Sequence, residues 1–431
     1  MTDNPLRILL LGLHYAPEQS GNGPYTAGLA AALAARGHHV TVRTGYPHYP
    51  AWRITEGYAG RRMTEHLDGV TVERFRPHIP DPLDPLDRAR MEASFGLASS
   101  LGRWHRPDVI LCVSPALLAT AVNVARARAT PRRPAIGVWV QDLYGLGARE
   151  TGTGGGRAAR ALGAIEARTL RSADGVAAIH QRMRDHMVRD LGVDGDRVRV
   201  IRNWTHLVPM ELPPRSEARA ELGWDPGEII ALHAGNMGAK QGLDNVIEAA
   251  RAALRTAPRL RFVLLGDGNQ RPRLEQLAEG MPNVTFVRPL PERGFRLAMA
   301  AADVLVLNEL PGLSDMAVPS KLTSYFTTGR PVVAATDAAS VTADEIRASA
   351  AGIQVDPTDP AALARAIVEL ATDARRASSL GKAGQEFCRR ELSQEHAIDQ
   401  YEGWLRDLVA RRRPSHPDLT GPTAPHLRGA E

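Results

Sequence analysis

The sequence predicts an α/β protein of two Rossmann-like parallel-sheet domains that face each other across a cleft. Three observations predict this class. The 431 residues suffice for two domains of ordinary size. Apolar runs of strand length alternate with helical stretches, the pattern typical of a parallel sheet covered on both faces. A proline-rich segment around 213–214 interrupts this alternation, which then begins again. The carboxyl ends of both sheets are therefore expected to border one ligand-binding cleft.

In the first half, strands are expected at short runs rich in branched apolar residues: 7–12, 39–44, 70–75, 108–113, 135–140, 175–179 and 198–201. Residues 28–36 are rich in alanine and are followed by Gly37, so a helix with a glycine stop is expected there. These elements make up a first domain over residues 1–207.

A linker is expected over 208–225, because this segment is proline-rich and mixed in charge. The strands expected after it are 228–235, 260–265, 284–287, 304–308 and 332–335, with a helix over 242–256. The second domain covers 226–385, and a C-terminal helix over 386–410 is expected to cross back to the first domain. The last segment, 411–431, is poor in apolar residues and is expected to be disordered.

Composition argues against several classes of protein. The two cysteines form no CxxC pattern, the 14 histidines show no HxxxH or HExxH spacing, and no DxD pair follows a strand. We therefore expect no bound metal, and the cysteine usage fits the reducing cytoplasm. No apolar stretch approaches about eighteen residues, so no transmembrane helix is expected. The first apolar run leads directly into a glycine turn, which indicates a strand and not a signal peptide.

The positive charge is carried almost entirely by arginine. The net charge is +5, and the chain has only three lysines, Lys240, Lys321 and Lys382. A lysine kept in so arginine-rich a chain indicates a site that needs a compact ammonium in place of a planar guanidinium. The excess charge favours anionic partners such as nucleotide phosphates, lipid diphosphates or anionic membranes. No nucleic-acid partner is expected.

Two polar loops follow predicted strands of the first half. The loop 17–25 contributes three candidate donor contacts, Gly21, Asn22 and Gly23, because glycines and a helix N-terminus suit a phosphate. It does not match GxGxxG, which disfavours a dinucleotide cofactor, and a plain glycine turn is the alternative. The strand 135–140 is followed by Gln141 and Asp142, which are candidate catalytic contacts, although Asp142 alternatively caps the next turn.

The second half carries the stronger phosphate motif. The loop 233–243 contains Gly235, Asn236 and Lys240, and its geometry aims an ammonium and free amides at a diphosphate. Lys240 is alternatively a solvent-facing residue near a helix start. The triplet Gly266, Asp267 and Gly268 closes the next strand, where it either packs against a nucleoside or forms a tight turn.

Further polar residues flank a helix start near residue 319. The candidate donor contacts there are Asn308, Gly312, Leu313, Ser320, Lys321 and Ser324. A helix beginning at 319–320 offers a second N-terminus for an anion. Ser320 is alternatively only a helix cap.

These motifs occur in an order that resembles a known family. G-N-G at 21–23, G-N-x-G-x-K-Q-G at 235–242, G-D-G at 266–268, P-S-K at 319–321 and G-R-P-V-V-A at 329–334 resemble family 4 glycosyltransferases of the GT-B fold. P-H-Y-P-x-W at 47–52 and V-Q-D-L at 140–143 are similar to the bacterial exopolysaccharide and O-antigen subgroup. That subgroup includes colanic-acid-type fucosyltransferases and N-acetyl-fucosamine transferases. The resemblance spans residues 7–410.

The resemblance implies a retaining transfer of a sugar from a UDP- or GDP-linked donor to a hydroxyl acceptor, without metal or cofactor, and with UDP or GDP as the bound product. The second domain would bind the nucleotide and the first the acceptor. Lys240 would neutralise the diphosphate beside Asn236, and Gly23 would approach it from the opposite lobe. Gln141 occupies the place where many relatives carry a histidine that touches the donor sugar.

One departure from the family pattern concerns a pair of glutamates eight positions apart. Their places are taken here by Met316 and Ser324. Ser324 would bind a ribose hydroxyl more weakly than a carboxylate does, and Asp315 or Glu309 would replace the first glutamate. A sugar-nucleotide epimerase and a non-catalytic sensor or scaffold remain alternative functions. Aromatic and basic residues over 46–62 suit either a lipid-linked acceptor with peripheral membrane contact or a soluble acceptor.

Overall fold

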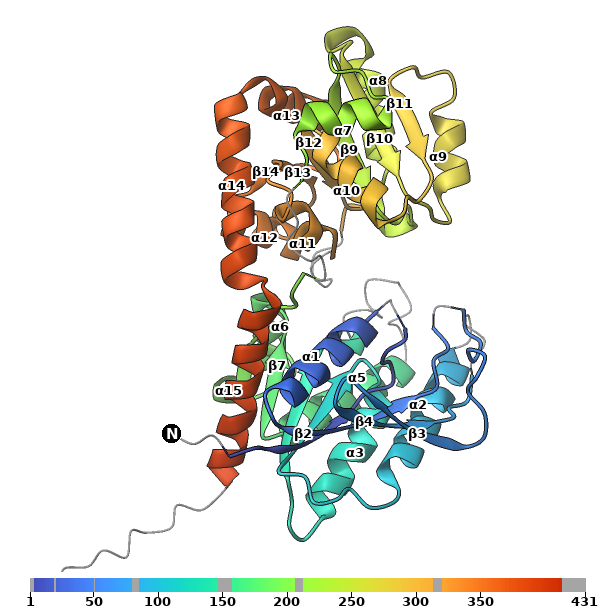
Figure 1. Cartoon of the computed structure of the whole chain (residues 1–431), viewed down its shortest axis with the longest axis vertical. Coiled ribbons are helices and arrows are strands. Elements are labelled where there is room, and N and C mark those ends of the chain that lie inside the picture. Colours follow the sequence, from blue (N-terminus) through green and yellow to red (C-terminus); the bar gives the residue numbers. More distant parts are fainter. Residues whose placement is uncertain are drawn as a thin grey trace, which may run out of the picture.

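The computed structural model describes residues 4–18, 21–49, 51–79, 85–145, 157–205, 212–312 and 320–412. These residues form two α/β domains, and two long helices run along one side of the pair (Figure 1). The predicted fold class is confirmed.

The first domain contains an eight-stranded sheet with the order β3-β4-β2-β1-β5-β6-β7-β8. Its strands are β1 (Arg7–Leu11), β2 (His39–Gly45), β3 (Arg62–Leu67), β4 (Val70–Phe75), β5 (Val109–Ser114), β6 (Ala135–Val140), β7 (Gly175–Ala178) and β8 (Val198–Val200). All neighbours are parallel except β3, which pairs antiparallel with β4. The helices are α1 (Gly23–Ala35), α2 (Pro85–Ser100), α3 (Leu117–Ala129), α5 (Arg157–Ser172), α6 (Gln181–Arg189) and the 3₁₀ turn η1 (Gly195–Arg197).

The second domain contains a six-stranded parallel sheet with the order β11-β10-β9-β12-β13-β14. Its strands are β9 (Ile229–Ala234), β10 (Leu260–Leu265), β11 (Val284–Val287), β12 (Val304–Asn308), β13 (Val332–Ala335) and β14 (Gly352–Val355). The helices are α7 (Arg215–Leu222), η2 (Ala239–Gln241), α8 (Asp244–Thr256), α9 (Arg271–Leu277), α10 (Glu292–Ala301), α11 (Ser320–Phe326), α12 (Val341–Ser349), α13 (Pro360–Thr372) and α14 (Ala374–Glu391).

The last helix, α15 (Gln394–Arg412), belongs to the core of the first domain. Tyr401, Trp404 and Leu408 are buried there, and the Tyr401 ring lies 4.8 Å from that of Trp139 on β6. The sequence placed a single crossing helix over 386–410. The structure divides this region at Leu392, because α14 follows the second domain and α15 follows the first (Figure 1). Helix α15 also continues to Arg412, so the first two residues of the tail predicted over 411–431 are helical, and residues 413–431 lie outside the described part.

Two strands and one helix were not expected from the sequence. β3 consists mainly of polar, exposed residues, and β14 is short, so neither has the apolar run of a buried strand. The segment predicted as a linker, 208–225, contains α7, whose Ala218 is buried against α10. Arg219 on α7 donates to Asp303 over 2.5 Å and thereby fixes α7 to the second domain. Residues 208–211 of this segment lie outside the described residues.

Two ion pairs join the domains near the cleft. Arg202, after β8, donates to Glu345 on α12, and Arg182 on α6 donates to Asp344 beside it. The Glu345 carboxylate is almost fully buried, whereas Asp344 is exposed. The two pairs thus bring the edge of the first sheet against α12.

Candidate active site

A cavity of about 550 Å³ lies between the two domains. Most of its wall comes from loops at the carboxyl ends of β1, β2, β6 and β8, which supply His14, Gly21, Asn22, Tyr49, Trp52, Gln141, Asp142, Arg202 and Asn203. Thr323 and Glu345 contribute from the second domain. Two parallel sheets place their polar loop residues at these strand ends, as open α/β folds do at ligand sites.

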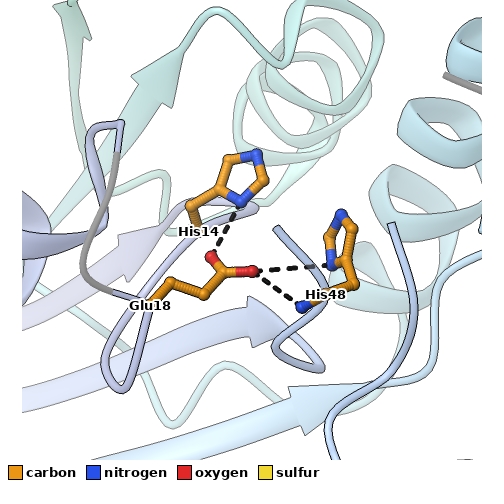
Figure 2. Close-up of side chains that lie close together, drawn as sticks. All are labelled: His14, Glu18 and His48. Carbon is orange, nitrogen blue, oxygen red and sulfur yellow. Dashed lines mark hydrogen bonds and ion pairs between the residues drawn. The ribbon is translucent and has the colours of Figure 1, made fainter. Parts of the chain in front are cut away.

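The first part of the wall is a cluster of His14, Glu18 and His48 (Figure 2). Glu18 is buried, and its Oε1 accepts the backbone N–H groups of His48 and Tyr49 over 2.8 and 2.9 Å. Its Oε2 lies 2.8 Å from His14 Nδ1. Burial alone would raise the pKa of Glu18, but the hydrogen bonds from His14 and the two backbone amides lower it, so the carboxylate is ionised.

This cluster is the one group with metal-ligand spacing among the residues that the structure describes. The hydrogen bonds that these residues already make compete with the binding of a metal ion. Both oxygens of Glu18 are already bonded, and His48 Nδ1 lies 2.8 Å from the carbonyl of Tyr46, to which it donates. A metal ion bound through Glu18 or either Nδ1 atom would have to displace these bonds, whereas His48 Nε2 has no protein partner.

The second part of the wall is the loop after β6. Asn203 Nδ2 donates to Gln141 Oε1 over 2.6 Å, which leaves Gln141 Nε2 and Asn203 Oδ1 buried without a protein partner. A buried donor beside a buried acceptor is costly unless a ligand or water satisfies both. Gln141 therefore lies where a substrate hydroxyl can be bound, and Asn203 is a partner that the sequence did not indicate.

Asp142 lies next to Gln141 and faces the second domain. Its Oδ1 accepts the N–H of Leu143 over 2.8 Å, so it caps its own turn, which the sequence left as an alternative. Burial in the cleft raises the pKa of Asp142, and the positive charge of Lys240 opposes this increase. The charge of Lys240 is thus close enough to act on the Asp142 carboxyl group.

Two further buried carboxylates hold the loops behind this wall. Glu166 accepts the backbone N–H groups of Tyr144 and Gly145 over 2.8 and 3.1 Å. Glu92 accepts the N–H of Leu118 over 3.0 Å and the hydroxyl of Tyr144. Burial raises the pKa of Glu92 to about 7, although its hydrogen bonds act in the opposite direction.

The second wall of the cleft, outside the residues that line the cavity itself, is built from the loop after β9. Lys321 Nζ donates to the backbone oxygen of Asn236 over 3.2 Å and lies 3.3 Å from His233 Nε2. Burial lowers the pKa of Lys321 to about 8, and Glu309 partly offsets this. A Cβ at Gly235 would lie 2.7 Å from Lys321 Cε, so only glycine leaves room for the lysine there. The sequence predicted both residues but not their contact.

Lys240 lies on η2, at the rim of the same loop. Its side chain is exposed, and its backbone oxygen accepts the N–H of Leu310 over 2.9 Å. Asn308 secures the loop from behind, because its Nδ2 donates to the carbonyls of Gln241 and Gly242. Asn308 is buried and bonded at both ends of its amide, so it supports the loop that carries Lys240.

The remaining predicted contacts lie farther along this edge. Gly266 has φ +142°, and a Cβ there would overlap the carbonyl of Gly235. The turn of Gly266, Asp267 and Gly268 therefore packs directly under the loop after β9. Gly312 donates its N–H to Asp337 over 2.8 Å, and Ser324 lies half-buried on α11. Leu313 and the side chain of Ser320 lie outside the described residues.

The structure thus separates the predicted residues into two walls. Gly21, Asn22, Gln141 and Asp142 line the cavity from the first domain, with Gly23 at the start of α1 behind them. The second wall holds Gly235, Asn236, Lys240 and Lys321, together with the 266–268 turn. Glu18, Asn203 and Arg202 were not predicted as site residues. The only sequence signal for Glu18 was its place in the P-E pair at the start of the loop 17–25.

Two facing Rossmann-like domains with a polar cleft and a cationic second wall define the class of GT-B glycosyltransferases. Residues 20–204 match the family described as "Glycosyl transferase 4-like domain", and residues 228–373 match "Glycosyl transferases group 1". The chain is 30% identical over 419 residues to the "Putative colanic acid biosynthesis glycosyl transferase WcaI" of Escherichia coli K12, covering 93% of this chain and all of that protein.

Solved structures show the same fold. Sucrose-phosphate synthase from Thermosynechococcus elongatus matches with a TM-score of 0.71 and 22% identity, over 94% of this chain and 99% of that one. Anabaena Alr3699/HepE in complex with UDP matches with a TM-score of 0.68 and 16% identity, over 93% and 100% of the chains. The chain belongs to the glycosyltransferase family of these group 1 and 4-like domains, and it is a transferase. This membership favours the transferase over the epimerase and the sensor.

Proposed function

We propose that the enzyme transfers a sugar from a UDP- or GDP-linked donor to a hydroxyl group of an acceptor in the synthesis of a cell-surface polysaccharide. The observation that carries the donor assignment is the second wall, where Lys240 and Lys321 lie at one loop beneath a close-packed glycine turn. The Anabaena relative has a structure in complex with UDP, and the Escherichia coli relative is named for colanic acid biosynthesis. Both support this proposal.

In this proposal, Lys240 and Lys321 compensate the charge of the diphosphate as it leaves. The Lys321 ammonium is desolvated and fixed by the Asn236 carbonyl, so its charge acts on the diphosphate at low local dielectric. Lys240 approaches from the rim, where its charge also acts on Asp142. Gln141 Nε2 and Asn203 Oδ1 bind hydroxyls of the donor sugar, because both atoms lack a protein partner.

We propose a retaining reaction without metal. The acceptor oxygen bonds to the anomeric carbon on the face that the diphosphate leaves, the bond from that carbon to the phosphate oxygen breaks, and the departing oxygen takes the hydroxyl proton. The support is the pair of lysines at the place of the diphosphate and the occupied hydrogen bonds of the His14 cluster. No protein base is needed in this scheme.

A lipid-linked acceptor is supported by the outer face of α2. Leu86, Leu97 and Leu101 are 70%, 58% and 68% exposed, on this helix or directly after it. Exposed leucines on one helix are typical of peripheral membrane contact. No helix in the described ranges is long and apolar enough to span a bilayer. If the proposal holds, a smaller fraction of the double variant Leu97→Gln/Leu101→Gln than of the wild type co-floats with anionic phospholipid vesicles. Equal fractions contradict it.

The test of donor binding is a thermal-shift screen against UDP, GDP, dTDP and ADP in the presence of EDTA. A ligand that binds only the native state at about a hundred times its Kd stabilises it by about 2.7 kcal/mol. We expect a shift with UDP or GDP that Lys321→Met reduces. No shift with any of the four nucleotides contradicts the proposed donor class, and a shift that EDTA abolishes contradicts metal independence.

A further inference from the structure

The proposed mechanism leaves one group of cavity residues without a role. His14, Tyr49, Trp52 and Arg88 lie together on the first-domain wall, away from the two lysines. The rings of His14 and Tyr49 are 5.6 Å apart, and those of Tyr49 and Trp52 are also 5.6 Å apart at an interplanar angle of 89°. The two aromatic rings therefore form a perpendicular corner beside the imidazole.

The bonding of Glu18 fixes which nitrogen of His14 carries the proton. Because the carboxylate is ionised and buried, His14 Nδ1 must donate to it over 2.8 Å. In the neutral ring, Nε2 then holds a lone pair. Figure 2 shows this second nitrogen on the side of the ring opposite Glu18. His14 lines the cavity, so it presents a hydrogen-bond acceptor there.

His48 lies beside His14 and Trp52. It donates through Nδ1 to the Tyr46 carbonyl, and burial lowers its pKa, so the ring is neutral. Its ring lies 5.3 Å from that of His14 and 6.2 Å from that of Trp52. A neutral ring beside His14 adds no positive charge at neutral pH. The charged and titratable groups that face His14 are thus Glu18, His48, Tyr49 and Glu92.

Trp52 is held in a costly conformation. Its φ is +52°, in the left-handed region that bulky residues avoid. The Arg88 guanidinium lies 5.0 Å from the centre of its ring and fixes one face. Backbone strain at a cavity residue is typical of a functional position, because the surrounding structure must offset its cost.

We propose that the acceptor is a saccharide whose terminal ring packs into the corner of Tyr49 and Trp52 and donates a hydroxyl hydrogen bond to His14 Nε2. The apolar C–H face of a sugar suits an aromatic ring, and its hydroxyl suits an imidazole lone pair. Glu18 is a positioning residue that holds the tautomer. The inference rests on the proposed function and adds its acceptor class and the residues that select it.

The test measures release of nucleoside diphosphate from the donor whose base the thermal-shift screen identifies. The acceptor probes are phenyl β-D-glucoside, phenyl β-D-galactoside, phenyl N-acetyl-β-D-glucosaminide and farnesyl phosphate, which is a lipid phosphate without a sugar. We expect at least one glycoside to accelerate release and farnesyl phosphate not to do so. His14→Gln should raise the acceptor KM about tenfold and leave the donor KM within about twofold.

Three comparisons separate this role from a structural one. Trp52→Ala should raise the acceptor KM, and Trp52→Phe should restore most of the affinity. The donor KM of Trp52→Ala should stay near that of the wild type, so that the loss is confined to the acceptor. The matched control is His39→Gln, which alters an exposed histidine on β2 and should change neither KM.

Several outcomes overturn the inference. The inference fails if both His14→Gln and Trp52→Ala keep the wild-type acceptor KM. It also fails if the KM values of donor and acceptor rise equally. Nucleotide binding without acceleration by any glycoside overturns the acceptor class and leaves the proposed function standing. Loss of transfer in EDTA that zinc restores in the wild type, but not in His14→Gln, shows a metal site instead. Failure of the wild type to bind any nucleotide overturns the proposed function itself.

Discussion

The two walls of the cleft use their charged groups in opposite ways. On the first wall, Glu18, Glu92 and Glu166 are buried, and each accepts at least one backbone N–H from a neighbouring loop. On the second wall, Lys240 is exposed, and Lys321 bonds to a carbonyl and a neutral histidine, with the charge of Glu309 nearby. Carboxylates therefore shape the first wall, whereas the lysines of the second wall supply charge for a ligand. Substitutions that remove the acceptor oxygens of the carboxylates should lower stability, and substitutions of the lysines should lower activity.

The largest effect on stability is expected at Glu166. Glu166→Ala leaves the N–H groups of Tyr144 and Gly145 without an acceptor, which should cost about 4 kcal/mol of unfolding free energy. Urea denaturation measures this cost. Glu166→Gln keeps one acceptor oxygen and should cost about half as much. A loss below about 1 kcal/mol in the alanine variant would show that these loops do not depend on the carboxylate.

Glu92 should give a pH-dependent effect of up to about 3 kcal/mol. Its pKa is about 7 in the folded chain, so between its ordinary value of 4.5 and 7 the folded state binds more protons than the unfolded state. Stability should therefore fall as pH rises through this window. Glu92→Gln should be more stable than the wild type at pH 8 and gain nothing at pH 4.

Denaturation of both proteins across this pH range measures the difference. Glu217→Gln, an exposed glutamate on α7, is the control and should follow the wild type at every pH. A wild-type profile parallel to that of Glu92→Gln would mean that Glu92 titrates as it does in the unfolded chain.

Lys321 should limit activity at high pH. Since its pKa is about 8, the ammonium loses its proton above that pH, and kcat/KM for the donor should fall by about tenfold per pH unit. Lys321→Arg keeps the charge, so its profile should stay flat to pH 10. Initial rates at low donor concentration measure this. A fall at the same pH in the arginine variant would assign the titration to another group.

The smallest effect is expected at the exposed interdomain pair. Arg182 and Asp344 should couple by no more than about 1 kcal/mol, because exposed ion pairs are screened by water. Arg202 and the buried Glu345 should couple more strongly. Double-mutant cycles measured by urea denaturation compare the two. Equal coupling energies in the two pairs would contradict the expectation that burial strengthens the pair of Arg202 and Glu345.

Much of the fold was predictable because buried parallel strands are short apolar runs. The central strands β1, β5, β6, β9, β10 and β12 are almost entirely apolar, and their predicted bounds agree with the structure to within about one residue. β3 was missed because an edge strand with one face in water lacks this pattern. Helix α7 was missed because Pro213–Pro214 directly precedes it, and proline is also favoured before a helix.

The candidate site was less predictable than the fold. Glycines and lysines that follow predicted strands identified the loops of the second wall. Locating these loops requires only that the strands be recognised in the sequence. The bond between Gln141 and Asn203 joins residues 62 positions apart, and the pair of Arg202 and Glu345 spans 143. Such contacts depend on how the loops and domains meet, for which a single sequence carries no local pattern. The same reason explains why the loop-supporting bonds of Asn308 were not predicted.

The most direct test of the central claim compares Lys240→Ala with Lys382→Ala. Both lysines are exposed, and the charge of Lys240 acts on Asp142 of the first wall. Steady-state kcat/KM for the donor, measured alongside urea denaturation, should fall by about 10²–10³-fold in Lys240→Ala with less than about 0.5 kcal/mol of lost stability. Lys382→Ala should match the wild type in both measurements. Wild-type turnover of Lys240→Ala at low donor concentration would contradict the assignment of charge compensation to the second wall.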